Sequence, residues 1–296
     1  MPHAAATGSR PGAGRRLELE LGSPPKLMGV LNVTPDSFSD GGLWLDPTAA
    51  IERGLAMLRA GADLLDLGAE STRPGGGVYG AGAAEVSVED ELERLIPVLR
   101  ELRRLTDVPL SVDTRRAAVA EAALAEGADL INDVSALADP RMASVVAEHG
   151  CAIVLMHSRG ELANMQRGIH FKDLLTEVAD ELRDRAAGAV AAGIDRRRIV
   201  LDPGIGFGKT VEHNLTLLRH LDRLAALGFP LLVGASRKSF IGAVAEAAPK
   251  ERLGGSLAAA AWAAQHRIAI LRVHDVAATH QFLAVWRAIE NAEGGA

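Results

Sequence analysis

Short apolar segments alternate with longer amphipathic segments along most of this chain. The apolar segments have the length and composition of buried parallel strands, and the longer ones show the i, i+3, i+4 recurrence of helices. Several helical segments end in glycine, the residue favoured just after a helix C-terminus. The predicted strands cover residues 26–33, 63–68, 109–113, 129–133, 152–157, 199–204, 230–236 and 268–275. The predicted helices cover residues 49–62, 88–104, 117–128, 140–150, 174–193, 211–228, 255–267 and 276–293.

This alternation predicts a parallel sheet, because parallel strands need a crossover connection between them. Eight repeats favour an α/β fold of the closed (β/α)8 barrel type, in a single domain over residues 27–292. A nine-strand doubly wound sheet remains the alternative. Residues 1–26 are rich in Gly, Pro and Arg, a composition typical of a flexible tail.

Composition narrows the partners that the protein could have. Hydrophobic residues make up 48% of the 296 residues and aromatic residues only 3%, so small aliphatic side chains must fill the core. The net charge is −6 with both signs interleaved, which argues against a nucleic-acid partner. The single Cys151 excludes an intrachain disulfide, and the chain has neither a membrane span nor a signal-peptide segment. We therefore expect a cytoplasmic protein without membrane contact.

Polar residues stand where each predicted strand ends. In a barrel these ends converge on one face, where the site forms. A carboxylate and an amide converging in an apolar cleft suit a flat heterocycle with an amide and an exocyclic amine. The strand-end residues are Asn32, Asp66, Asp113, Asn132 with Asp133, His157, Asp202, Ser236 with Lys238, and Arg272 with His274.

Each of these residues also has a plainer interpretation. Asp113 precedes an Ala-rich predicted helix, a position at which an Asp is an expected N-cap. Asn132 and Asp133 could be turn formers. The segment GIGFGKT, residues 204–210, lacks the first glycine of a phosphate-binding Walker loop, because Pro203 occupies that position.

Lys238, Arg272 and His274 are predicted to bring positive charge to the face where the strand ends converge. Such basic side chains are expected to bind an anionic group. The nine His residues show no zinc-type spacing. Asn32 could give one oxygen to a Mg²⁺ otherwise held by water and phosphate, although backbone capping is equally common for such an Asn. The Gly-rich loop 71–87, which carries Arg73, is either a flexible connection or a mobile lid.

A set of motifs, in order, resembles dihydropteroate synthase from Met28 to about Ile289. The motifs are MGVLNVTPDSFSDGG, DLGAESTRPG, SVDT, IND, LMH, LDPGIGFGK, LLVGASRKSFIG and RVHDV. The resemblance implies a TIM barrel that joins 4-aminobenzoate to (7,8-dihydropterin-6-yl)methyl diphosphate, releasing diphosphate. It also implies Mg²⁺ as cofactor and a homodimer, for which the helical segments 255–267 and 278–289 offer apolar surface.

The resemblance assigns roles to individual residues. It implies catalytic roles for Lys238, Asp202, Asp113 and Arg73, and a Mg²⁺ contact for Asn32. The residues implied for the pterin diphosphate are Thr72, Asp113, Asn132, Met156, Asp202, Phe207, Lys238, Arg272 and His274. Those implied for 4-aminobenzoate are Phe38, Thr72, Arg73, Pro74 and Ser236.

Two departures from the family pattern stand out: residues 76–82 look like an insertion, and SRGELANMQ follows LMH where Met-Gln-Gly is common. Two other functions remain alternatives. One is a related barrel that transfers a methyl group from methyltetrahydrofolate, which would need neither Mg²⁺ nor a diphosphate clamp. The other is a pterin-binding paralogue without catalytic activity.

Overall fold

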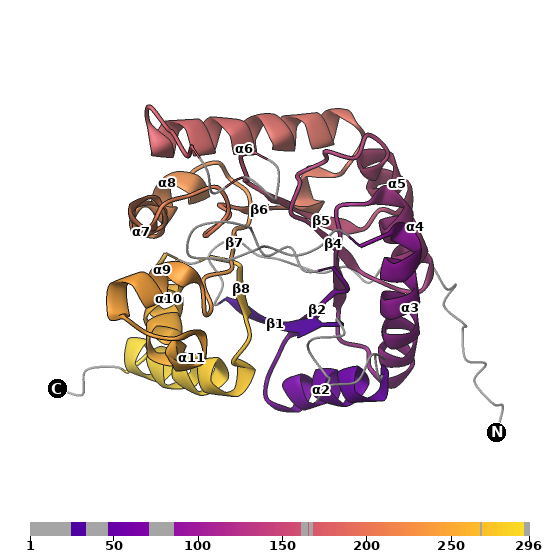
Figure 1. Cartoon of the computed structure of the whole chain (residues 1–296), viewed down its shortest axis with the longest axis horizontal. Coiled ribbons are helices and arrows are strands. Elements are labelled where there is room, and N and C mark those ends of the chain that lie inside the picture. Colours follow the sequence, from indigo (N-terminus) through magenta and orange to yellow (C-terminus); the bar gives the residue numbers. More distant parts are fainter. Residues whose placement is uncertain are drawn as a thin grey trace, which may run out of the picture.

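The computed structural model describes residues 25–33, 47–70, 86–160, 165, 168–266 and 268–292. Within them, eight parallel strands form a barrel and helices form a ring around it (Figure 1). The strands are β1 (Lys26–Asn32), β2 (Leu64–Gly68), β3 (Leu110–Asp113), β4 (Leu130–Asp133), β5 (Ala152–Met156), β6 (Ile199–Asp202), β7 (Leu232–Val233) and β8 (Ile270–Val273). The predicted (β/α)8 fold is confirmed.

The helices follow the strands in turn, with two short 3₁₀ segments, η2 (Arg196–Arg198) and η3 (Pro249–Glu251). They are α2 (Pro47–Arg59), α3 (Val88–Leu105), α4 (Ala117–Ala125), α5 (Met142–His149), α6 (Leu174–Ala191), α7 (Val211–Arg219), α8 (Leu221–Ala225), α9 (Ser239–Ala245), α10 (Leu253–Gln265) and α11 (Val276–Glu290). Among the described helices, none combines the length and the apolar character that a membrane span needs.

The sheet closes on itself through its two terminal strands. The ladder runs β6-β5-β4-β3-β2-β1-β8-β7, and a parallel bridge between Leu201 and Leu231 joins β6 to the start of β7. This closure leaves no room for the nine-strand open sheet that the sequence allowed.

Two apolar layers hold the fold, and side-chain alternation along the strands creates them. Leu65 and Leu67 of β2 belong to the outer layer between sheet and helices, whereas Leu64 belongs to a smaller cluster inside the barrel. The inner cluster consists of Met28, Leu64, Leu130, Ala152, Val154, Val200, Leu232, Ala269 and Ile270. It fills the N-terminal half of the barrel, so any site must lie in the other half.

Three local features differ from the sequence-based prediction. The predicted helix 211–228 is two helices that meet at His220, and β7 has two residues where seven were predicted. The helix α9 was not predicted. The glycines predicted at helix ends, Gly61, Gly127, Gly150, Gly193 and Gly228, all have positive φ, and Gly150 is the C-cap of α5.

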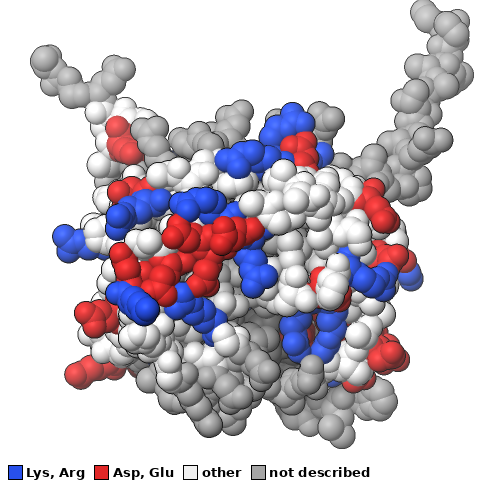
Figure 2. All heavy atoms as spheres, turned by 90° about the horizontal axis from the view of Figure 1, so that it is seen from above, with Lys and Arg blue, Asp and Glu red and all other residues white. Residues whose placement is uncertain are grey.

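Acidic and basic side chains alternate over the surface on the side of α6 (Figure 2). Arg159 pairs with Glu177 at 2.7 Å and also contacts Glu181, both on α6. The prediction of interleaved charge is confirmed on this face. Residues 1–24 lie outside the described residues, so the flexible tail stays a prediction.

Candidate active site at the C-terminal mouth of the barrel

Above the inner apolar cluster, the inward-facing positions become polar. Asp66, fully buried on β2, is the hub of this layer. Its Oδ1 accepts a hydrogen bond from Ser111 Oγ at 2.6 Å. Its Oδ2 accepts from Asn132 Nδ2 at 3.0 Å and from Arg272 Nε at 2.6 Å. One carboxylate therefore ties together β2, β3, β4 and β8.

Arg272 carries this network one layer higher, to Asp113. Its Nη2 donates to Asp113 Oδ2 at 2.8 Å. Asp113 Oδ1 is buried and has no hydrogen-bond partner within the described part of the chain. Burial raises the pKa of Asp113 to about 7; Arg272 opposes this rise and Asp66 adds to it. An orphaned, buried carboxylate oxygen that faces the barrel mouth is a ready acceptor for a ligand N–H.

The N-cap alternative for Asp113 is wrong. Arg116 is the residue at the N-cap of α4, and it makes no side-chain capping bond. The first free backbone N–H of that helix, on Ala117, donates instead to Asp139 Oδ2 at 2.8 Å. Asp133 is the turn former that was suggested, because its carboxylate accepts from the backbone N–H groups of Ser135 and Leu137. Asn132, one residue earlier, turns inward.

Asp202 and Lys238 form the second charged group of the mouth. Asp202 ends β6, where its Oδ1 accepts from Gly204 N at 2.7 Å. Burial raises the pKa of Asp202, and the nearby Lys238 opposes that rise. Burial in turn lowers the pKa of Lys238 to about 8, opposed by Asp202. The charge of Arg272 lowers the pKa of both Asp202 and Lys238. The Asp202–Lys238 pair therefore lies near the network that Arg272 forms with Asp66 and Asp113.

The Lys238 ammonium is held in place by the loop after β6. It donates to the carbonyl oxygen of Ile205 and lies 4.5 Å from the centre of the Phe207 ring. A cation against an aromatic face is a favourable contact. Lys238 and Phe207, both predicted pterin residues, are thus brought together as the sequence suggested.

Ser236 and His274 lie side by side at the ends of β7 and β8. Ser236 Oγ accepts from His274 N at 3.2 Å, and His274 Nδ1 lies 3.2 Å from the same oxygen. Burial, with Arg272 adding to it, lowers the pKa of His274 to about 4. His274 is therefore neutral at pH 7, and the prediction that it adds positive charge to the site is wrong. It can still offer a ring N–H.

The remaining predicted residues divide into two groups. Met156 is buried at the end of β5, opposite Asp202 in the ladder, and Asn32 ends β1 with an exposed side chain. Phe38, Thr72, Arg73 and Pro74 lie outside the described residues, as do the loop insertion 76–82 and most of the SRGELANMQ segment. Their roles stay predictions.

Two buried residues were absent from the predicted site. Asp66 was noted only as a strand-end residue, although its place two residues after Leu64, a member of the inner cluster, makes it inward-facing. Lys209, in the rejected Walker-like segment, is 2% exposed and donates to His157 Nδ1 at 2.9 Å. A lysine directly after a Gly-rich turn at a strand end was the available signal.

Comparison with known proteins agrees with this geometry. Residues 28–274 match the family described as pterin binding enzyme. The chain belongs to this family. It is 45% identical to a dihydropteroate synthase from Synechocystis sp. over 274 residues, which are 90% of this chain and 92% of the relative. The resemblance inferred from the motifs is confirmed.

Solved structures lead to the same family. The chain is 47% identical to dihydropteroate synthase from Xanthomonas albilineans with 4-aminobenzoic acid, with a TM-score of 0.84 over 91% of this chain and 94% of that one. A second structure from that organism, in complex with 7,8-dihydropteroate, is 44% identical, with a TM-score of 0.81 over 91% of this chain and 95% of that one. The fold and nearly the whole length are shared.

Proposed function

We infer that this protein is a transferase of folate biosynthesis that catalyses the dihydropteroate synthase reaction. It condenses (7,8-dihydropterin-6-yl)methyl diphosphate with 4-aminobenzoate to give 7,8-dihydropteroate and diphosphate. The observation that carries this inference is the match to dihydropteroate synthases over nine-tenths of the chain at 45–47% identity. Within the described part of the site, no feature favours methyl transfer or a loss of activity.

Asp113, Asn132, Asp202 and Lys238 are proposed to hold the pterin. The free Oδ1 of Asp113 would accept from the ring's N–H groups, and the Asn132 amide offers both a donor and an acceptor. Lys238 would donate to a ring acceptor above Phe207. Met156 would pack against the flat ring from the end of β5.

The proposed reaction develops negative charge on the leaving diphosphate and positive charge on the methylene carbon, and the barrel mouth has groups that could stabilise each. As the C–O bond of the methylene carbon breaks, negative charge grows on the diphosphate and cationic character develops at carbon. Arg272 and the neutral His274 would stabilise the first by hydrogen bonding. The electron-rich pterin between Asp113 and Asp202 would spread the second. The arylamine is already nucleophilic, so no strong base is needed.

Water exclusion is proposed for the loops that carry Phe38 and Arg73, because water could otherwise trap the cation. Thr72, Arg73, Pro74, Phe38 and Ser236 are proposed to bind 4-aminobenzoate. The Ser236 Oγ accepts from His274 N, and this contact supports the proposal that Ser236 binds 4-aminobenzoate beside the diphosphate residue His274.

Mg²⁺ is proposed as the cofactor, with Asn32 as its one protein ligand. The donor set fits such an ion: Asn32 is exposed at the end of β1, and the described residues contain no cluster of three or more His, Cys, Asp or Glu side chains that would cage a metal. Mg²⁺ is commonly held by one or two protein groups together with substrate phosphates and water. When bound, it would neutralise charge on the departing diphosphate.

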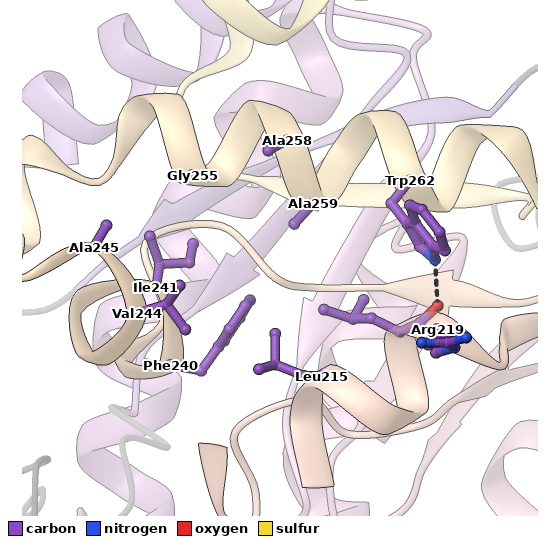
Figure 3. Close-up of a pocket in the computed structure, with 11 residues that line it drawn as sticks. Leu215, Arg219, Phe240, Ile241, Val244, Ala245, Gly255, Ala258, Ala259 and Trp262 are labelled. Atoms are coloured by element: carbon purple, nitrogen blue, oxygen red, sulfur yellow. Dashed lines mark hydrogen bonds between the residues drawn. The ribbon is translucent and has the colours of Figure 1, made fainter. Parts of the chain in front are cut away.

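A homodimer is proposed through α7, α9 and α10. Figure 3 shows apolar side chains from these helices facing one another across a groove of about 340 Å³. Val244 is 62% exposed, Trp262 44% and Leu215 43%. Sedimentation of Val244→Asp should show monomer where the unaltered protein shows dimer. The control is Leu105→Asp, because Leu105 is 43% exposed and ends α3, away from this groove.

A cytoplasmic location is proposed because Cys151 is free and buried, which suits a reducing compartment.

The catalytic proposal is tested by following diphosphate release with 4-aminobenzoate and the pterin diphosphate. Release that requires both substrates and Mg²⁺ is the expected result. Lys238→Ala and Asp202→Asn should lower the rate by at least ~100-fold, the scale of a lost preorganised charge. Unaltered protein that binds pterin but releases no diphosphate would support the non-catalytic paralogue instead.

A further inference from the structure

Lys209 is a buried lysine for which the proposed chemistry has no use; burial lowers the pKa of its amine to about 7, and Asp202 opposes that fall. Its side chain is 2% exposed, and its ammonium donates to three acceptors. These are His157 Nδ1 at 2.9 Å, His157 O at 3.2 Å and Phe207 O at 2.9 Å. An ammonium satisfied by three acceptors at such depth is costly to bury, and an apolar side chain would fill the space more cheaply.

These bonds fasten two loops to each other. His157 follows β5, whereas Phe207 lies in the Gly204–Thr210 loop that follows β6. The two backbones approach closely, because a Cβ built on Gly204 would lie 1.9 Å from His157 O and one on Gly208 would lie 2.8 Å from Arg159 O. The glycines permit this approach, and Lys209 binds both sides of it.

The His157 ring lies next to α6. Because Lys209 donates to Nδ1, the ring proton sits on Nε2. That nitrogen lies 3.1 Å from Glu181 Oε2 but makes no hydrogen bond within the described part of the chain, and Glu181 pairs with Arg159. Burial, with Lys209 adding to it, lowers the pKa of His157 to about 2, so the ring stays neutral.

The fastened loop supports Lys238. The Ile205 carbonyl and the Phe207 ring are the two groups that hold the Lys238 ammonium, and both lie between the glycines of this loop. The far end of the loop has its own anchor, since Asn214 donates to Thr210 O at 2.8 Å and accepts from Gly206 N at 2.7 Å. Loss of Lys209 would therefore release mainly the side of the loop that faces β5 and the pterin.

We propose that Lys209 is a positioning residue that fixes Phe207 and the Ile205 carbonyl against the end of β5 and thereby sets the pterin-binding position of Lys238. The proposal rests on the proposed function, because it assumes that Lys238 and Phe207 bind the pterin. Lys209 also lies close enough to Asp202 for their charges to attract, whereas its charge and that of Lys238 repel, so its support of Lys238 acts through the loop contacts.

The test compares Lys209→Met, which keeps the length and removes the charge, with Lys209→Gln, which keeps a neutral donor. Lys250→Met is the matched control, since Lys250 is an exposed lysine in η3. Calorimetry with 6-hydroxymethylpterin measures pterin affinity and the fraction of competent sites without turnover. Steady-state kinetics with both substrates gives the two KM values.

The expected result is a folded Lys209→Met protein with full binding stoichiometry and pterin affinity lowered about tenfold, equivalent to ~1.4 kcal/mol. Lys209→Gln should lose less, Lys250→Met nothing, and the KM for 4-aminobenzoate should stay within about twofold in all three. A role in folding alone would lower the fraction of competent sites and leave both KM values unchanged.

Three results would overturn the proposal. They are unchanged pterin affinity in Lys209→Met, equal increases in both KM values, and failure of both Lys209 variants to fold at 25 °C. Failure of the proposed function is distinguishable, because it would appear in the unaltered protein as pterin binding without diphosphate release.

Discussion

Asp66 is predicted to control pterin binding without touching the pterin, and Asp66→Asn tests this. The asparagine has the same shape, so packing is conserved and only the charge is lost. Ser111 can still bond to it, because a hydroxyl both donates and accepts. Arg272 Nε and Asn132 Nδ2, however, exchange a charged acceptor for a neutral one.

The magnitude follows from those two bonds. Hydrogen bonds to charged groups contribute about 1.5–3 kcal/mol and neutral ones about 0.5–1.5 kcal/mol. The Arg272 bond at 2.6 Å should lose about 1–2 kcal/mol and the longer Asn132 bond less, giving about 1–3 kcal/mol of lost stability in all. Arg272 keeps its bond to Asp113, so the loss stays below the ~3–5 kcal/mol of a fully broken buried pair.

Pterin affinity should fall by about tenfold in Asp66→Asn. Arg272 would bind Asp113 more strongly once its bond to Asp66 is weakened, and it would then compete with the pterin for the Asp113 carboxylate. Urea denaturation measures the stability and calorimetry with 6-hydroxymethylpterin measures the affinity. Ser111→Ala is the control: it removes one bond to Asp66 and should leave pterin affinity unchanged. If Asp66→Asn matched the unaltered protein in both measurements, the carboxylate would not be the hub described above.

Three further predictions concern pH, the loop glycine and the metal. Affinity for 6-hydroxymethylpterin should rise as Asp113 ionises at a pKa of about 7 and fall as Lys238 deprotonates at about 8; titration calorimetry of Asp113→Asn should show no acid limb. The raised pKa of Asp113 also adds stability that is full below pH ~4 and lost as the pH rises through about 7, which urea denaturation across pH can check. Gly204→Ala should destabilise by ~2 kcal/mol or more, because its Cβ would lie 1.9 Å from His157 O, whereas Gly188→Ala, with open space around it in α6, should stabilise slightly in thermal melts. Removing Mg²⁺ with a chelator should weaken binding of the pterin diphosphate and leave binding of 6-hydroxymethylpterin unchanged; equal losses for the two would remove the metal from the diphosphate subsite.

The barrel was predictable because its signal repeats. Each strand contributes an apolar run and each helix an amphipathic one, so an error in one element does not change the architecture. Local breaks carry no such repetition. The helix 211–228 divides at His220 with no Pro or Gly to mark the break, and α9 has only seven residues, too few for a helical period to stand out.

A site residue could be predicted from the sequence where its position in a strand alone determines that it faces the barrel interior. Asp113, Asn132 and Asp202 stand at strand ends and face inward, as the alternation requires. Asp66 and Lys209 were harder, because what sets them apart is the set of partners that each one bonds. Ser111 and Arg272 are 45 and 206 residues from Asp66 in the chain, and no local pattern reports a contact over such a separation. The charge of His274 was mispredicted for the same reason, since its neutral state depends on burial beside Arg272.

The charges of the described mouth nearly cancel, and this balance has a consequence for the diphosphate. Three buried carboxyl groups, of Asp66, Asp113 and Asp202, are matched by Lys209, Lys238 and Arg272. Burial brings the pKa of both Asp113 and Lys209 to about 7, and His274 is neutral. Each cation is already engaged by a carboxylate or by several acceptors. A multiply charged diphosphate entering such a site would add negative charge that Arg272 could offset only while it shares its contacts with Asp66 and Asp113. We therefore predict that the remaining compensation comes from charge outside the described residues, and the predicted sources are Mg²⁺ at Asn32 and the side chain of Arg73 in the 71–87 loop.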